Sequence, residues 1–197
     1  MNRFLPLLFL LVMPLAQAAA PANGGTSKLQ FNLPVDARCK LSLGSHVIDY
    51  GTMSRGQLQD TTQGRNTLTP GKRTMILSAV CPYSQSMRFA LRGDRSATGN
   101  LRYGDQGSMT VRISEAQLDG QSVQVVSTSL EGIVSGAASD TRLLQPGQIF
   151  APIANGRLAK GKAFTARLEI EPVLPEAETR VSARQSSEAT LTLELMN

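Results

Sequence analysis

The sequence predicts an all-β sandwich, and two features of the chain carry that prediction. Most apolar side chains occur in short runs that alternate with polar ones, the period-two pattern of a strand with one buried face. Gly, Pro, Asn and Asp separate these runs, and no sustained helical periodicity is present. Many short strands joined by such turns are typical of a sandwich, although spacing alone does not separate a sandwich from a barrel.

The first residues predict a secretory signal peptide. Arg3 precedes an apolar run over residues 4–15, and Ala16-Gln17-Ala18 supplies the small-x-small pattern of a cleavage site. The apolar run is shorter than the roughly twenty residues that a membrane-spanning helix needs. We therefore expect residues 1–18 to be removed, the protein to be exported, and no membrane anchor to remain.

The first predicted strand follows a segment without bulky apolar side chains. Residues 19–28 contain Pro21 and a Gly24-Gly25 pair, which disfavour helix, so we expect this segment to be extended or mobile in the isolated chain. From Leu29 to Cys39, apolar residues fall at every second position, which predicts a strand. Pro34 lacks an N–H group, so this strand should lie at a sheet edge or carry a break there.

The remaining strands are predicted from the same alternation. The segment 74–81 is nearly all apolar and is expected to be a central core strand. In chain order, the predicted strands lie in 41–51, 74–81, 87–91, 109–113, 123–126, 164–170 and 191–195. The predicted turns are Pro70-Gly71, Arg92-Gly93-Asp94, Asp119-Gly120, Pro146-Gly147 and Asn155-Gly156.

The cysteine count and the charge narrow the class of protein. Cys39 and Cys81 are the two cysteines, and an even number in an exported chain predicts a disulfide; two buried thiols are the alternative. The net charge of +5 comes from scattered Lys and Arg residues. We interpret this charge as a contribution to solubility and expect no nucleic acid partner.

The sequence offers little for catalysis. His46 is the single histidine, and neither a Gly-x-Ser-x-Gly elbow nor a phosphate-binding glycine loop is present. We therefore expect no enzymatic activity, no catalytic residues, no metal and no cofactor. Arg92-Gly93-Asp94 matches a tripeptide that integrins read, but the same residues also suit a turn at the end of a strand.

Three stretches together resemble the chaperone–usher fimbrial subunits, or pilins, and are closest to a less-studied branch similar to type 1 pilins. The first is Asn23-Gly24-Gly25-Thr26 ahead of the strand that ends in Cys39. The second is the interval from Cys39 to Cys81, with Ile48-Asp49-Tyr50-Gly51 inside it and Pro82 after it. The third is the pair of segments 163–168 and 189–195. The middle, about residues 94–160, is less distinctive.

The resemblance implies an immunoglobulin-like, pilin-type β-sandwich that lacks its last strand. In that family a periplasmic pilus chaperone lends a strand, an outer-membrane usher assembles the subunits, and the N-terminal extension of a neighbouring pilin subunit replaces the lent strand. Here residues 19–28 would be the donor extension and residues 29–197 the pilin domain. The protein would pass through the periplasm to a fimbrium at the cell surface and contribute to cell adhesion.

The resemblance also assigns roles to individual residues. Cys39 and Cys81 would form the family's disulfide. The donor extension would use Ala20, Ala22, Gly24, Gly25, Leu29 and Phe31. The strand that contacts the chaperone and lines the groove would use Leu191, Leu193, Leu195 and the carboxylate of Asn197. The family often has an aromatic residue next to last, where this chain has Met196.

A second hypothesis stays open beside the fibre subunit. The extension is poor in bulky apolar side chains, so the chain could sit at a fibre tip, where no donor is needed. It could also be a self-contained secreted binding module that recognises a host or matrix ligand. The fibre subunit predicts a fold that needs a donor strand, whereas the self-contained module predicts a monomer that is stable alone.

Overall fold

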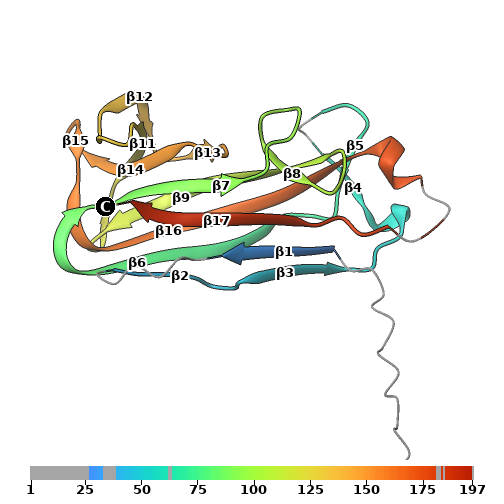
Figure 1. Cartoon of the computed structure of the whole chain (residues 1–197), viewed down its shortest axis with the longest axis horizontal. Helices are drawn as coiled ribbons and strands as arrows, with labels where there is room; N and C mark the ends of the chain where they lie inside the picture. Colours follow the sequence, from blue (N-terminus) through green and yellow to red (C-terminus); the bar gives the residue numbers. More distant parts are fainter. Residues whose placement is uncertain (1–26, 33–38, 62–63, 181–182, 184, 197) are drawn as a thin grey trace, which may run out of the picture.

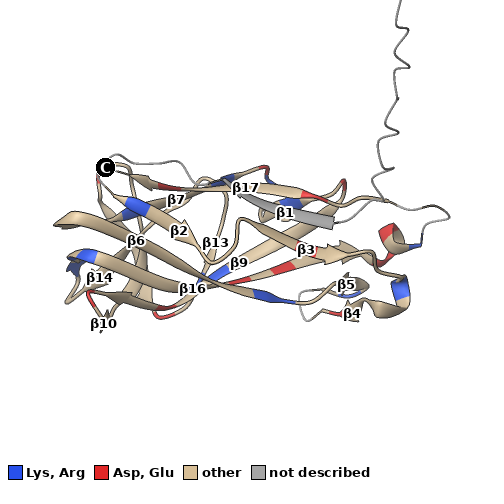
Figure 2. Ribbon diagram, turned by 90° about the horizontal axis from the view of Figure 1, so that it is seen from below, with Lys and Arg blue, Asp and Glu red and all other residues tan. Residues whose placement is uncertain are grey.

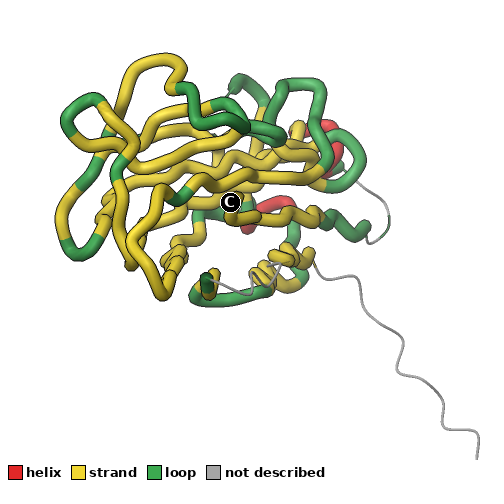
Figure 3. The backbone as a smooth tube through the Cα atoms, turned by 60° about the vertical axis from the view of Figure 1, so that its left-hand side comes forward, coloured by secondary structure: helices red, strands yellow, loops and turns green. Residues whose placement is uncertain are grey.

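The computed structural model describes residues 27–32, 39–61, 64–180, 183 and 185–196, and for 27–32 it describes the backbone pairing. The described chain is all-β, with two antiparallel sheets in a sandwich-like arrangement (Figure 1). Helix is limited to two short 3-10 turns, η1 (Arg55–Gln57) and η2 (Glu176–Thr179). In Figure 3 strands, joined by loops, account for most of the described chain.

The first sheet contains the C-terminal strand in its interior. Its strand order is β12-β11-β14-β7-β17-β1-β3, and β15 pairs with β14. All of its pairings are antiparallel except that of β1 with β17, which is parallel. The bounds are β12 (Val134–Ser139), β11 (Gln124–Thr128), β14 (Ile149–Ala154), β7 (Arg88–Gly93), β17 (Ala189–Met196), β1 (Ser27–Asn32), β3 (Val47–Gly51) and β15 (Arg157–Leu158).

The second sheet is built around three long strands. β16 pairs with β6 and with β9, and shorter strands extend the sheet on both sides. The bounds are β6 (Arg73–Ser86), β9 (Gly107–Leu118), β16 (Lys160–Pro175), β2 (Lys40–Leu43), β4 (Gln59–Asp60), β5 (Thr67–Thr69), β8 (Leu101–Tyr103), β10 (Gln121–Ser122) and β13 (Arg142–Leu144).

The core lies between the sheets and follows the predicted alternation. Phe89 of the first sheet stacks on Phe150, with ring centroids 5.4 Å apart, and contacts Phe164 of the second sheet at 4.8 Å. All three rings are fully buried. Burying a large aromatic side chain contributes about 1.5–3 kcal/mol, so this cluster is a main link between the sheets.

Several sequence predictions are refined by the structure. Segment 41–51 is two strands, β2 and β3, separated by the turn that contains His46. β6 has neighbours on both sides, as a central strand should, but only one of its faces is buried, since Ile76 and Val80 are about half exposed. β1 also has neighbours on both sides, so it is not an edge strand. Pro34 lies outside the described residues.

Two predicted turns have the backbone that their sequences favour. Asp119 and Gly120 both have positive φ angles (50° and 78°), as do Asn155 and Gly156 (51° and 73°). Two successive left-handed residues match the right-handed twist of a tight hairpin, and Asx-Gly is the pair that adopts them at least cost. The first turn joins β9 to β10 and the second joins β14 to β15.

Candidate functional site

β17 contains Leu191, Leu193 and Leu195, the leucines that the sequence analysis assigns to the groove strand. Its side chains alternate, and Ala189, Leu191 and Leu193 are buried with at most 7% of their surface exposed. Leu195 is half-buried and packs against the same core. The predicted inward face of this segment is therefore confirmed. A normal last strand and a strand that lines a groove both place these leucines inward.

The two neighbours of β17 are the central feature of the site. On one side β7 pairs antiparallel, with Leu193 opposite Leu91. On the other side β1 pairs parallel, with Leu29 opposite Ala189 and Phe31 opposite Leu191. β1 in turn pairs antiparallel with β3. The first described strand thus fills the space between the last strand and β3, as the order of labels in Figure 1 shows.

The predicted donor residues fall only partly within the described chain. Leu29 and Phe31 belong to β1, which runs beside β17 of the same chain. The predicted signal peptide, residues 1–18, lies outside the described residues. So do the donor positions Ala20, Ala22, Gly24 and Gly25 and the C-terminal Asn197.

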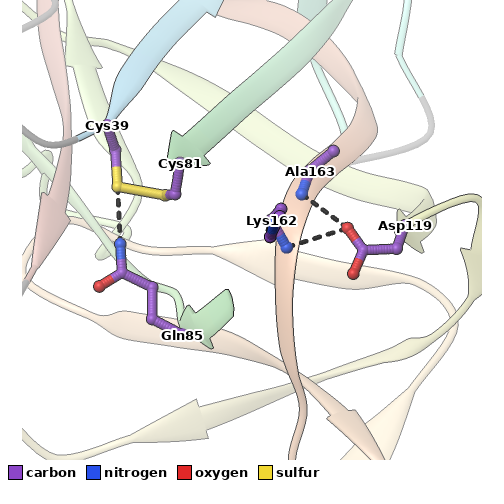
Figure 4. Close-up of a disulfide and its surroundings, with 6 residues drawn as sticks. All are labelled: Cys39, Cys81, Gln85, Asp119, Lys162 and Ala163. Carbon is purple, nitrogen blue, oxygen red and sulfur yellow. Dashed lines mark hydrogen bonds between the residues drawn. A yellow bond between two sulfur atoms is a disulfide. The ribbon is translucent and has the colours of Figure 1, made fainter. Parts of the chain in front are cut away.

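The predicted disulfide is present and joins the strands at the start of the domain. Cys39 and Cys81 are bonded, their Cα atoms are 4.2 Å apart, and both are buried (Figure 4). The pairing of β2 with β6 brings them together, because Lys40 lies opposite Val80. The side-chain amide of Gln85 donates a 2.7 Å hydrogen bond to Cys39 Sγ.

Near the disulfide, Asp119 accepts hydrogen bonds from the backbone of β16 at a shift in strand register (Figure 4). The register between β16 and β6 shifts between Gly161 and Ala163, which frees backbone N–H groups. Asp119 Oδ1 accepts hydrogen bonds from the backbone N–H groups of Ala163, at 2.8 Å, and Lys162, at 2.9 Å. These bonds, with that from Ala163 first, lower the pKa of the Asp119 carboxyl.

A pocket opens at one end of the sandwich, where β3 ends and η1 and η2 lie. Its volume is about 400 Å³, within the range of sites that bind small molecules. Tyr50, Tyr103 and Leu174 contribute apolar surface, and Asp105 and Glu178 contribute carboxylates. Sequence reasoning missed this site, because its residues come from five separate parts of the chain.

Tyr50 in this pocket has an unusual environment. It is 8% exposed, and its hydroxyl has no hydrogen-bond partner among the described residues. Burial raises its pKa, so the side chain stays a neutral phenol. The guanidinium of Arg73 lies 5.2 Å from the centre of the Tyr50 ring. This cation–π contact helps to hold the ring in its position.

The Arg92-Gly93-Asp94 tripeptide is engaged within the fold. Arg92 Nε donates to Glu194 Oε2 of β17 at 2.7 Å. Asp94 forms an ion pair with Arg102 at 2.5 Å. Both charged side chains therefore have partners on neighbouring segments, which favours the turn interpretation over an adhesive one.

The remaining chemistry-bearing residues are dispersed. His46 is exposed in the turn between β2 and β3. Among the described residues, no three His, Cys, Asp or Glu side chains come together as a metal site would require. Figure 2 shows Lys and Arg interspersed with Asp and Glu along the ribbon, which matches the scattered charge of the sequence.

Comparison with known proteins adds no family assignment. No family model matches the chain, and no curated protein matches it at a significant level. In the part of the chain that the structure describes, no helix is long and apolar enough to cross a bilayer.

Proposed function

We propose that this chain is a structural subunit of a chaperone–usher fimbria and contributes to cell adhesion. The observation that carries the proposal is the parallel pairing of β1 with β17. β1 is the first described strand, and its first two residues, Ser27 and Lys28, are the last two of the predicted donor extension, residues 19–28. The N-terminal part of the chain is thus the part that completes the sheet beside the last strand.

The physical reason for exchange lies in the backbone pairing of β1. If β1 left the sheet, β17 and β3 would each lose a row of backbone hydrogen bonds. Unpaired backbone groups along a strand are unfavourable, so a replacement strand would bind there. β1 is the first described strand, so its departure would break no connection between the other strands, but it would separate β3 from β17.

The partners follow from this requirement. A periplasmic chaperone would supply the strand before assembly, the outer-membrane usher would add subunits, and the N-terminal extension of a neighbouring pilin would supply it in the fibre. The fold would then be of the immunoglobulin-like pilin type, incomplete without a supplied strand. Leu191, Leu193 and Leu195 would line the groove, and Asn197 would contact the chaperone.

A second candidate is a self-contained secreted binding module, including a subunit at a fibre tip. The pairing of β1 with β17 also favours this candidate, because here β1 belongs to the same chain as the sheet that it completes. Such a module would need no partner to fold. The pocket beside Tyr50 would then be its first candidate ligand site.

A linked-strand experiment separates the two candidates. The first protein is the chain from Ala19. The second lacks residues 19–32 and carries residues 27–37 after the C-terminus, joined by a flexible linker. β17 has eight residues, about 26 Å of strand, so a linker of roughly 14 residues permits parallel insertion and one of about two permits only antiparallel insertion.

Thermal unfolding followed by circular dichroism gives the answer. The fibre-subunit hypothesis predicts that the chain from Ala19 is only marginally stable, or aggregates at high concentration. It also predicts that a linked-strand protein is a monomer whose thermal transition is sharper and lies at a higher temperature. The comparison of linkers then reports the direction of the inserted strand. A chain from Ala19 that unfolds cooperatively as a stable monomer, with no gain from the linked strand, would favour the self-contained module.

A further inference from the structure

A depression beside β11 is lined by an arginine and by polar side chains. It lies between β11, β12 and the start of β14, which are together at one end of the molecule in Figure 1. Its lining consists of residues 127–129, 135–136, 142 and 147–149, and no Asp or Glu is among these described residues. Its volume is about 510 Å³, within the range of sites that bind small molecules. We call it the Arg142 depression.

Arg142 is the charged residue of this lining. It is half-buried and donates hydrogen bonds to the Val125 carbonyl, to Ser127 Oγ at 3.1 Å and to the Ala137 carbonyl. These acceptors are neutral, and no ion pair is recorded for Arg142 in the described chain. A guanidinium has more N–H groups than these bonds use, so Arg142 keeps donors for a ligand. A half-buried cation without a counter-ion favours an anionic partner.

Arg95 and Ser127 add further donors at the wall of the depression. Arg95 donates to the Pro146 carbonyl, and its Nη2 lies 3.8 Å from where a Cβ on Gly147 would be. Like Arg142, it has no recorded ion pair among the described residues. Ser127 Oγ accepts from Arg142, and its own O–H has no recorded acceptor, so its hydrogen can be donated to a ligand. Two guanidinium groups and a hydroxyl favour a ligand rich in acceptors.

The carboxylates near this region do not cancel that charge. The hydroxyl of Ser129 donates to the Glu131 carboxylate and, with the charge of Arg88, lowers the pKa of that carboxyl. Asp140 precedes Arg142 by two residues, and no ion pair between the two is recorded in the described chain. Neither acid belongs to the lining, so the net charge of the lining is positive.

The neutral part of the lining suits a carbohydrate better than a peptide. β11 pairs with β12 and β14, and β14 pairs with β11 and β7, so neither strand offers a free edge to an extended peptide. Ser135 and Gln148 supply hydroxyl and amide groups, which can hydrogen-bond to the hydroxyls of a sugar. The depression is also much larger than one sulfate or carboxylate group, so it has room for the sugar that carries it.

We propose that the Arg142 depression binds a sulfate or carboxylate group of an acidic carbohydrate, with Arg142, Arg95 and the Ser127 hydroxyl as donors. Hydrogen bonds from a guanidinium to an oxyanion are charge-assisted and stronger than those between neutral groups. The inference goes beyond strand exchange, because β7 separates β14 from β17 in the sheet and β1 does not have to move.

A competition assay tests the class of ligand. The chain from Ala19, at low concentration, is titrated against a fluorescently labelled heparin-derived tetrasaccharide, and anisotropy measures binding. Unlabelled tetrasaccharide and sialyllactose should displace the probe, whereas lactose, which is neutral, should not. Sodium sulfate at matched ionic strength should compete only at much higher concentration, because it lacks the sugar.

Variants locate the binding. Arg142→Gln and Arg95→Gln each remove one guanidinium and should weaken binding on the order of tenfold. Arg112→Gln removes the same charge from an exposed position in the middle of β9 and is the matched control. Ser127→Ala keeps every charge and should weaken binding roughly threefold. Thermal melting monitors the fold of each variant. Because Arg142 also holds the Ala137 carbonyl, Arg95→Gln and Ser127→Ala decide the result if Arg142→Gln does not fold.

Three results would overturn the proposal. They are a wild-type chain that binds no acidic saccharide, lactose that competes as well as sialyllactose, and binding that Arg142→Gln and Arg95→Gln weaken no more than Arg112→Gln. Free sulfate that competes as well as the tetrasaccharide would overturn the assignment to a carbohydrate. None of these results depends on β1, so failure here leaves the proposed fibre function standing, and failure of strand exchange leaves this site standing.

Discussion

At the residue scale, the disulfide between Cys39 and Cys81 is the clearest stabilising device. It closes a loop of 42 residues, which in the chain-entropy model contributes roughly 4 kcal/mol by restricting the unfolded chain. We predict that replacing both cysteines by alanine lowers the free energy of unfolding by about 2–4 kcal/mol, measured by urea denaturation. The oxidised wild type should lose a similar amount on reduction, and no loss in either case would contradict this account.

Asp119 gives a prediction that depends on pH. Its pKa is lowered in the folded chain by the backbone N–H groups of Ala163 and Lys162. A lowered carboxyl pKa stabilises the fold above the unfolded pKa of about 3.9, and this contribution is lost as the pH falls through the folded value. Asp119→Asn should therefore lower the melting temperature at pH 7, and the difference from wild type should shrink below about pH 4.

The control for this prediction is Asp140→Asn, which changes another exposed carboxylate. Asparagine tolerates the left-handed backbone that Asp119 adopts, so the turn itself should survive. A difference between Asp119→Asn and wild type that persists unchanged at low pH would show that the charge is not what matters.

At the scale of elements, Gly93 limits how β7 meets β17. A Cβ at this position would lie 2.5 Å from Leu101 Cδ2 and 3.0 Å from the Thr190 carbonyl oxygen. We predict that Gly93→Ala costs roughly 1–3 kcal/mol, because one or both contacts must shift. Gly56→Ala is the control, since nothing lies within 4 Å of a Cβ there. Equal melting temperatures for the two variants would contradict the packing argument.

Alternation and turn chemistry were enough to predict part of each long strand, although β6, β9 and β16 all extend beyond the predicted segments 74–81, 109–113 and 164–170. Phe89 and Leu91, the residues around Ile113, and Leu168 with Ile170 are buried as their period-two pattern indicates. Asp119-Gly120 and Asn155-Gly156 adopt the left-handed pairs that their sequences favour. These features are local, so the sequence carries them without any knowledge of the tertiary structure.

Other features depend on contacts that local patterns do not contain. β12 reads Val-Ser-Gly-Ala-Ala-Ser, without the large apolar residues that mark a strand, and it forms by pairing with β11. Ile76 and Val80 are apolar but exposed on the outer face of β6, so composition alone overestimated the burial of that strand. The pocket assembles Tyr50, Tyr103 and Leu174 from three strands, which no spacing rule connects.

At the scale of the whole molecule, the arrangement of β17 joins the stability of the fold to the proposed assembly. The last strand of the described chain lies inside its sheet, and the first described strand covers one of its sides. A terminal strand in that position can come from the same chain or from another, because the hydrogen bonds of the backbone are the same in both cases. Our central claim is that this strand can be exchanged.

The most direct test supplies the strand in trans. The protein is the chain that begins at Pro34 and so lacks β1, and the probe is a labelled peptide of residues 19–37, with a scrambled peptide as control. Fluorescence anisotropy measures binding, and circular dichroism measures melting of the mixture. Our account predicts a truncated chain that is unstable alone and a one-to-one complex with a higher, cooperative transition. A truncated chain that melts cooperatively by itself and ignores the peptide would contradict it.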